Sequence, residues 1–327
     1  MSTPELSVIV PVYNEEAVLP KLFERLYRAL DALDRTYEIV FVDDGSRDRS
    51  AQLLAQQFRL RPDVTRVVLF NGNFGQHMAI LAGFERMRGR IAVTLDADLQ
   101  NPPEEIGRLL EAIDAGHDYV GTIRRLREDR AFRRLSSKAM NWLRERITRI
   151  QMTDQGCMLR AYGRELVDTL NACQEVNTFI PALAYTFAAN PTEIEVAHEE
   201  RFAGESKYSL YRLIRLNFDL VTGFSIVPLQ WFSLIGTVLS LGAGALFVLL
   251  LVRRFVLGAE VQGVFTLFAL QFFLIGIVLF GIGLMGEYVG RIQQEVRRRP
   301  RFRISGVLEA PNVTAVRSPQ RAGETRR

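Results

Sequence analysis

Short apolar runs alternate with longer stretches of helical periodicity through the first 125 residues. The short runs are rich in β-branched residues, and in the longer stretches apolar residues recur every three or four positions. We expect strands at 6–12, 38–42, 65–69, 91–95 and 119–122, and helices at 17–33, 48–59, 76–87 and 103–115. This alternation predicts an α/β fold with a mostly parallel sheet covered by helices on both faces.

Two long segments without a charged residue follow much later, at about 228–252 and 264–286. Each exceeds the roughly 20 residues needed to span a bilayer, which leaves buried core helices as the weaker alternative. We therefore predict two transmembrane helices joined as a hairpin. The basic stretch 207–215 before them and the arginines after them favour a cytoplasmic N-terminal domain and C-terminus. Arg253 and Arg254 in the connecting loop oppose this orientation but are outnumbered.

Two further stretches suit amphipathic helices at a membrane interface. Apolar residues recur at helical spacing over 131–147, with basic residues nearby, and 210–224 leads directly into the first long apolar segment. For 131–147, a solvated helix packed on the core and a helix against anionic lipid headgroups explain the pattern equally well. The tail after about Pro311 is expected to be disordered.

Composition excludes several classes of protein. The net charge is only +4, so no global field indicates a nucleic-acid partner. The two cysteines, Cys157 and Cys173, lack the spacing of a zinc site or a disulfide framework, which fits a reducing compartment. The N-terminus does not have the pattern of a cleaved signal peptide. Motifs of P-loop NTPases, dinucleotide-binding domains and Gly-x-Ser-x-Gly hydrolases do not occur.

Polar residues gather where four predicted strands end, in segments 11–16, 43–46, 71–77 and 96–98. Because the carboxyl ends of parallel strands lie at one edge of a sheet, we expect a single polar cleft there. Asp96 and Asp98, with Gln100 two residues further, offer hard oxygen ligands suited to Mg²⁺ or Mn²⁺ holding a diphosphate. Exposed acidic loops also produce such pairs, but a position at the end of a buried strand favours the metal.

Together these strings resemble inverting nucleotide-sugar glycosyltransferases of the GT-A fold. They are Val10-Pro11-Val12-Tyr13-Asn14-Glu15, Val42-Asp43-Asp44-Gly45-Ser46 and Asp96-Ala97-Asp98. Within these enzymes, the chain from about Leu6 to Arg301 is similar to polyprenyl-phosphate glycosyltransferases such as dolichyl-phosphate mannose synthase. Longer strings favour the branch that uses 4-deoxy-4-formamido-L-arabinose and undecaprenyl phosphate: 73–77, 95–106, 154–162, 178–181 and 204–209.

The resemblance implies a role for each matching residue. Asp96, Asp98 and Gln100 would hold Mg²⁺ or Mn²⁺ against the donor diphosphate, and Asp98 and Asp154 form the catalytic set. The UDP-sugar would be bound by Pro11, Tyr13, Glu15, Asp44 and Asp96. The acceptor phosphate would meet Arg124, Arg133, Ser137 and Lys207.

Several of these roles have alternatives. Asp154 could be a base, a residue that positions the acceptor, or an ordinary turn residue before Gly156. Arg134 competes with Arg133 through a one-residue shift, and a surface charge run is the usual explanation for any single arginine. Glu15 also suits a helix N-terminus. His77 could contact the sugar, but a lone histidine is more often structural.

By resemblance, the chain comprises a GT-A (Rossmann-like) domain with amphipathic interface helices and two C-terminal transmembrane helices. Its expected parts are a nucleotide-sugar and metal-binding core at 1–125, an acceptor-binding region at 126–223, a transmembrane hairpin at 224–290 and a basic tail at 291–327. The resemblance also implies a bacterial inner-membrane location and a homotetramer, assembled through the membrane helices and strand exchange near the C-terminus.

The implied reaction is inverting transfer of 4-deoxy-4-formamido-L-arabinose from UDP to undecaprenyl phosphate, which serves lipid A modification and resistance to cationic peptides. The same chemistry with a hexose such as UDP-glucose is the first alternative. A membrane protein that binds nucleotide sugars without turnover is the alternative from another class. Two spans are too few for the channel of a polysaccharide synthase.

Overall fold

The computed structural model describes residues 3–124, 152–154, 156–173, 179–199, 227–257, 264–297 and 300–310. The chain forms two compact units. One unit comprises 1–138, 150–207 and 299–327, and the other comprises 139–149 and 208–298. The expected interface helices at 131–147 and 210–224 lie outside the described residues.

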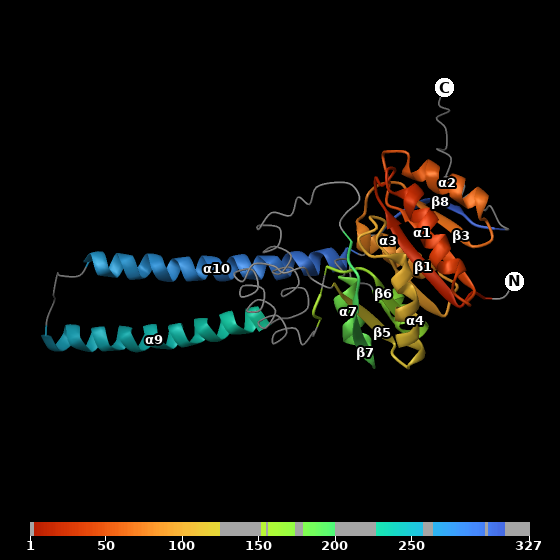
Figure 1. Cartoon of the computed structure of the whole chain (residues 1–327). Coiled ribbons are helices and arrows are strands. Elements are labelled where there is room, and N and C mark those ends of the chain that lie inside the picture. Colours follow the sequence, from red (N-terminus) through yellow and green to blue (C-terminus); the bar gives the residue numbers. More distant parts are fainter. Residues whose placement is uncertain are drawn as a thin grey trace, which may run out of the picture. The chain divides into compact units, whose positions relative to one another are not determined.

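The first unit is built on a mixed sheet whose described strands have the order β7-β5-β6-β4-β1-β2-β3-β8 (Figure 1). Parallel pairs join β1 to β2 and β4, β2 to β3, and β5 to β7. Antiparallel pairs join β6 to β4 and β5, and β8 to β3. The strands are β1 (Leu6–Val12), β2 (Tyr37–Asp43), β3 (Thr65–Phe70), β4 (Ile91–Thr94), β5 (Tyr119–Arg124), β6 (Arg160–Gly163), β7 (Pro191–Val196) and β8 (Ile304–Leu308).

Helices cover both faces of this sheet. One face carries α1 (Leu19–Asp31), α2 (Ser50–Leu60) and α4 (Ile106–Asp114), the last preceded by the short helix η1 (Pro103–Glu105). The other face carries α3 (Gln76–Arg86) and α6 (Arg164–Ala172), with α7 (Ile180–Phe187) next to α6 and β5.

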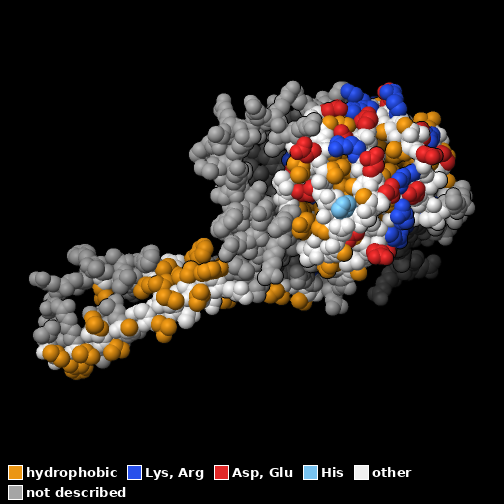
Figure 2. All heavy atoms as spheres, turned by 60° about the horizontal axis from the view of Figure 1, so that its bottom comes forward, with side chains coloured by type: hydrophobic (Ala, Val, Ile, Leu, Met, Phe, Trp, Pro, Cys, Tyr) orange, Lys and Arg blue, Asp and Glu red, His pale blue; other side chains and the backbone are white. Residues whose placement is uncertain are grey.

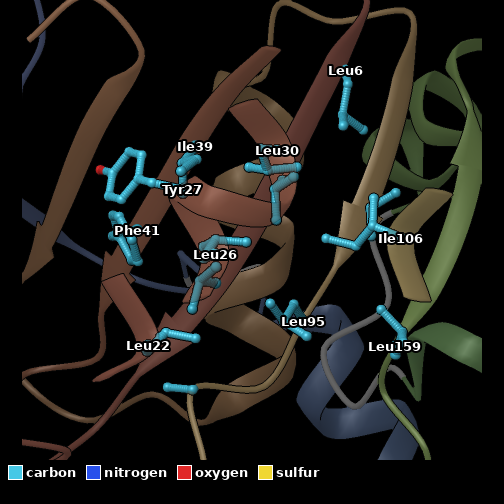
Figure 3. Packing of buried hydrophobic residues seen from close by; sticks show 14 of the residues in the cluster. Leu6, Leu22, Leu26, Tyr27, Leu30, Ile39, Phe41, Leu95, Ile106 and Leu159 are labelled. Carbon is cyan, nitrogen blue, oxygen red and sulfur yellow. The ribbon is translucent and has the colours of Figure 1, made fainter. Parts of the chain in front are cut away.

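The main core lies between the first of these layers and the sheet. Leu22, Leu26 and Leu30 recur at helical spacing on α1 and lie opposite Ile39 and Phe41 of β2 (Figure 3). All five side chains are completely buried. Burying a large apolar side chain contributes about 1.5–3 kcal/mol, so this stripe fixes α1 on the sheet.

The structure confirms the five predicted strands and four predicted helices to within a few residues. Strands β6, β7 and β8 were not predicted. The short β6 contains Arg160, which is fully buried, and an arginine argues against a core strand in the sequence. Strand β8 lies in the basic tail, ahead of the part after about Pro311 that is expected to be disordered.

The second unit contains two long helices, α9 (Val227–Leu257) and α10 (Val264–Val296), which lie side by side (Figure 1). The apolar side chains that the structure describes on these helices are largely exposed, whereas acidic and basic groups alternate over the first unit (Figure 2). The two helices approach closely at Gly281 of α10, where the ring of Phe232 of α9 lies over the glycine. A Cβ atom added at Gly281 would lie only 2.1 Å from that ring.

Within the described residues, no helix reaches the combination of length and hydropathy required to cross a membrane.

Close packing of α3 on β1 leads to a stability prediction. A Cβ atom on Gly83 would lie 2.4 Å from Cγ2 of Ile9, a fully buried residue. We expect Gly83→Ala to lower the free energy of unfolding by about 1–3 kcal/mol through overpacking, measured by denaturant unfolding. Gly107→Ala is the matched control, because its Cβ atom would make only an ordinary 3.5 Å contact with Leu33. Equal stability of the two variants would contradict the packing argument.

Candidate active site

Four loops follow β1, β2, β3 and β4 at one edge of the sheet, where the sequence analysis expected a polar cleft. Two of them contain the non-glycine residues with positive φ in the described part of the chain. These are Asn14 after β1, with φ 55°, and Leu99 after β4, with φ 60°. Asparagine tolerates this conformation, but leucine does so only at a cost of about 1–3 kcal/mol. Such strain is typical of functional loops.

The loops after β1 and β2 hold each other in place. The Asn14 N–H donates to Ser46 Oγ at 3.0 Å, and the Arg47 N–H donates back to Asn14 Oδ1 at 2.8 Å. The Glu15 N–H donates to Ser50 Oγ at 2.9 Å. Both loops therefore have fixed main chains, with Tyr13 exposed beside them at 42%. Pro11 and Glu15, the other expected nucleotide-binding residues here, are half-buried.

Asp44 links the second loop to the third. It is 3% exposed, and its two oxygens accept the N–H groups of Phe74 at 2.6 Å and Gly75 at 2.8 Å. Burial raises the pKa of Asp44, and the two N–H bonds oppose that shift. The carboxylate thus fixes the loop immediately before α3. Its expected contact with the nucleotide remains a prediction beside this structural role.

Asp43 is a candidate that the sequence analysis did not select. It is buried, and its Oδ1 atom has no hydrogen-bond partner among the described residues. Burial raises the pKa of Asp43. An unpaired buried oxygen is costly, which makes it a place where a donor group on a ligand could bind. The sequence did contain a signal for Asp43, because this residue directly precedes Asp44 in the string that predicted the second loop.

Asp96, Asp98 and Gln100 follow β4 around the strained Leu99. Asp98 is 8% exposed and accepts the Gln100 N–H at 3.1 Å. Asp96 accepts a hydrogen bond from Gln76 Nε2 at 2.5 Å, so the start of α3 orients this carboxylate. Gln76 was not predicted from the sequence as a site residue.

These residues fit a divalent cation. No three His, Cys, Asp or Glu side chains form a metal-binding group within the described residues. Mg²⁺, however, typically takes only one or two carboxylates and completes its shell with water and substrate phosphates. Two carboxylates and an amide oxygen on one loop meet that requirement.

Arg124 and Asp154 form an ion pair at the end of β5. Arg124 Nε and Nη2 donate to the two oxygens of Asp154 at 2.6 and 2.9 Å. Burial alone would raise the pKa of Asp154, but hydrogen bonds and the charge of Arg124 lower it overall. Asp154 Oδ1 also accepts the Gly156 N–H at 2.9 Å, so the turn role is present as well.

Arg160 holds the loop that carries Asp154. Its guanidinium donates to the carbonyl oxygens of Asp154 at 2.6 Å and Cys157 at 2.8 Å, and to the hydroxyl of Tyr119. Because Arg160 is fully buried, these bonds replace its hydration. A buried cation at the start of β6 thus positions the acidic residue six positions earlier.

Two histidines lie near these groups. His198, which follows β7, is influenced by the charges of Arg124, Asp98 and Asp154. Partial desolvation, followed by Arg124, lowers its pKa, while the two aspartates oppose the shift. His198 was not predicted from the sequence. Burial, helped by Arg160, lowers the pKa of His77 to about 4. The His77 ring meets Phe179 edge to face at 5.3 Å, which favours the structural interpretation.

The remaining expected acceptor contacts, Arg133, Ser137 and Lys207, lie outside the described residues. The structure therefore brings Arg124 and Asp154 together and leaves the other three as predictions.

Comparison with known proteins identifies the family. Residues 7–170 match the family model described as Glycosyl transferase family 2. A protein of Pseudomonas aeruginosa (strain LESB58), named undecaprenyl-phosphate 4-deoxy-4-formamido-L-arabinose transferase, is 52% identical over 323 residues, which cover 98% of this chain and 95% of that protein. The protein of the same name from Aeromonas hydrophila subsp. hydrophila is 49% identical over 308 residues, with 93% and 94% covered. The chain belongs to glycosyl transferase family 2.

Comparison with solved structures gives a more distant similarity. Glucosyl-3-phosphoglycerate synthase from Mycobacterium tuberculosis, in complex with Mg²⁺ and uridine-diphosphate, is 16% identical with a TM-score of 0.47. The match covers 67% of this chain and 77% of that one.

The bond from Gln76 to Asp96 leads to a binding prediction. Groups that orient a metal ligand typically account for about 10- to 100-fold in metal affinity or activity. We expect Gln76→Ala in the glycosyltransferase to weaken Mn²⁺-dependent binding of UDP by a factor in this range, measured by titration calorimetry. Gln52→Ala on the exposed side of α2 is the control and should bind as the wild type does. Unchanged binding by Gln76→Ala would refute the orienting role.

The Arg124–Asp154 pair leads to a pH prediction. Because the folded-state pKa of Asp154 is lowered, the pair stabilises the fold fully above the carboxyl group's ordinary pKa, about 3.9. That contribution is lost as the pH falls through the lowered value. We expect Asp154→Asn to cost about 1–2 kcal/mol of unfolding free energy at pH 7. The difference from wild type should shrink below about pH 4.

Asp168→Asn is the matched control for this measurement. Asp168 pairs with Arg164 on an exposed helix surface, where such a pair contributes about 0.5 kcal/mol or less. Thermal unfolding of both variants at several pH values measures the two effects. A cost for Asp154→Asn that is no larger than that for Asp168→Asn would contradict the prediction.

Proposed function

We propose that this glycosyltransferase moves 4-deoxy-4-formamido-L-arabinose from UDP to undecaprenyl phosphate with inversion, for lipid A modification and cationic peptide resistance. The observation that carries the proposal is the arrangement of two charged centres at one edge of the sheet. The acidic loop of Asp96 and Asp98 follows β4, and the Arg124–Asp154 pair lies at the end of β5. The choice of sugar and lipid is supported by the names of relatives that are about 50% identical over nearly the whole chain.

On the donor side, the residues bind and orient the nucleotide. Pro11, Tyr13, Glu15 and Asp44 line the first two loops, whose main chains are already fixed by hydrogen bonds. Asp96, Asp98 and Gln100 would hold Mg²⁺ or Mn²⁺. The metal would offset the charge that develops on UDP as it leaves, so no protonated acid is required there.

On the acceptor side, the enzyme needs to bind an anion and does not need a strong base. A phosphate monoester has its second pKa near 6 and is largely a dianion at neutral pH. The lowered pKa of Asp154 makes it a weak base, which favours positioning over proton abstraction. Asp154 occupies Nε and Nη2 of Arg124, while Nη1 donates to no described residue. That free edge of the guanidinium suits an incoming phosphate.

The two predicted membrane spans remain a prediction, and we propose that they anchor the enzyme in the bacterial inner membrane. Both termini and the catalytic domain would be cytoplasmic, and the assembly would be a homotetramer. Support comes from the uncharged segments 228–252 and 264–286, from exposed apolar side chains on α9 and α10, and from the arginines that follow. Labelling of cysteines introduced near each terminus, with cross-linking of the intact assembly, tests these points.

One assay tests the reaction. Purified full-length protein receives Mn²⁺, undecaprenyl phosphate and one UDP-sugar at a time, and lipid products are separated by thin-layer chromatography. We expect product with UDP-4-deoxy-4-formamido-L-arabinose. Asp98→Asn should reduce turnover by at least about 10²-fold, because it removes a charged metal ligand.

Glu111→Gln, an exposed carboxylate on α4, is the control and should retain full activity. Product from UDP-glucose instead would show that the enzyme is a hexosyltransferase, which is the alternative function. UDP binding without turnover of any donor would support a non-catalytic binding protein.

A further inference from the structure

Three phenylalanines connect the end of the chain to the candidate donor site. Phe302 stacks on Phe70 with ring centroids 5.0 Å apart and planes 13° apart. Phe70 in turn meets Phe74 edge to face at 5.6 Å. Aromatic pairs at these distances contribute beyond their buried area. Phe302 precedes β8, whereas Phe70 ends β3 and Phe74 lies in the loop before α3.

The main chain fixes this contact. Strand β8 pairs antiparallel with β3, and an irregularity between Leu69 and Phe70 shifts the register at the end of the pair. Beyond it, the Asn71 N–H donates to the carbonyl oxygen of Arg303 at 3.1 Å. Phe302 therefore lies against the first residues of the loop.

The same loop holds two donor-site contacts. Asp44 binds the N–H groups of Phe74 and Gly75, and Gln76 orients the Asp96 carboxylate. Most of its side chains are exposed, including Phe74 at 38%. With so few buried side chains of its own, the loop depends on contacts at its ends for a fixed position. Asp44 supplies one such contact, and the ring pair of Phe70 and Phe302 supplies the other.

We infer that Phe302 is a positioning residue of the donor site and that it acts through Phe70 and Phe74 on the loop at 71–75 and the start of α3. The inference rests on the proposed function, because it assumes that UDP binds beside Asp44 and Asp96. It assigns a role in donor binding to a segment that follows α10 and lies more than 200 residues from the nearest donor-site residue along the chain.

The test measures UDP affinity in the presence of Mn²⁺ by titration calorimetry, on the full-length protein. We expect Phe302→Ala to weaken UDP binding by about two- to tenfold, the range that one aromatic pair supports. The KM for donor should rise with little change in the KM for lipid phosphate. Phe302→Tyr keeps the ring and should restore the wild-type affinity.

Ser305→Ala separates positioning from general stability. It removes the hydrogen bond from Ser305 Oγ to the carbonyl oxygen of Leu69, which anchors the same strand at 3.0 Å, but leaves the rings in place. We expect a lower thermal midpoint with unchanged UDP affinity. If Phe302→Ala folds poorly, Phe302→Leu keeps an apolar side chain without the ring and should still bind UDP more weakly.

Wild-type UDP affinity in folded Phe302→Ala or Phe302→Leu would overturn the inference while leaving the proposed function intact. Equal loss of UDP affinity in Ser305→Ala would overturn it too, because strand stability alone would then explain the effect. Failure of the wild type to bind UDP at all would instead refute the proposed function, and the inference with it.

Discussion

The buried carboxylate of Asp44 accepts two hydrogen bonds on which the proposed donor half of the site depends. Its oxygens accept hydrogen bonds from the N–H groups of Phe74 and Gly75, which would otherwise be unpaired at the start of α3. The bonds join the end of β2 to the loop after β3, and this loop reaches Asp96 through Gln76. One acidic side chain thereby sets the relative positions of three loops. Preorganisation of this kind lowers the cost of binding a nucleotide.

Two arginines with different tasks organise the proposed acceptor half of the site. Arg160 is enclosed by carbonyl oxygens and a tyrosine hydroxyl, and fixes the main chain near Asp154. Asp154 then orients Arg124, which is partly accessible. A permanently charged guanidinium held by a carboxylate suits recognition of a phosphate that already carries its own negative charge. In the proposed mechanism, orientation of the acceptor therefore matters more than acid–base chemistry.

Much of the core was predictable from the sequence, because its strands and helices have clear hydrophobic periods and its polar loops share one edge. Asp43 and Gln76 were harder to select, since their importance depends on which atoms are buried or paired after folding. His198 follows a strand that was not predicted, so nothing in the sequence linked it to Asp98. The buried Arg160 is an exception to the rule that charged residues are exposed. Strand β6 was not predicted because it contains this arginine. Strand β8 was not predicted because arginines crowd the sequence next to it.

The insertion of β6 between β4 and β5 has a geometric consequence. Neighbouring strands lie about 4.8 Å apart, so β4 and β5 are separated by two strand widths, roughly 10 Å, where β6 pairs with both of them. In the proposed reaction, this spacing leaves room for the sugar between the donor loop after β4 and the acceptor group at the end of β5. Strand β6 therefore sets the spacing between β4 and β5. Changes to the pairing of β6 would alter this spacing without replacing any residue that is expected to bind either substrate.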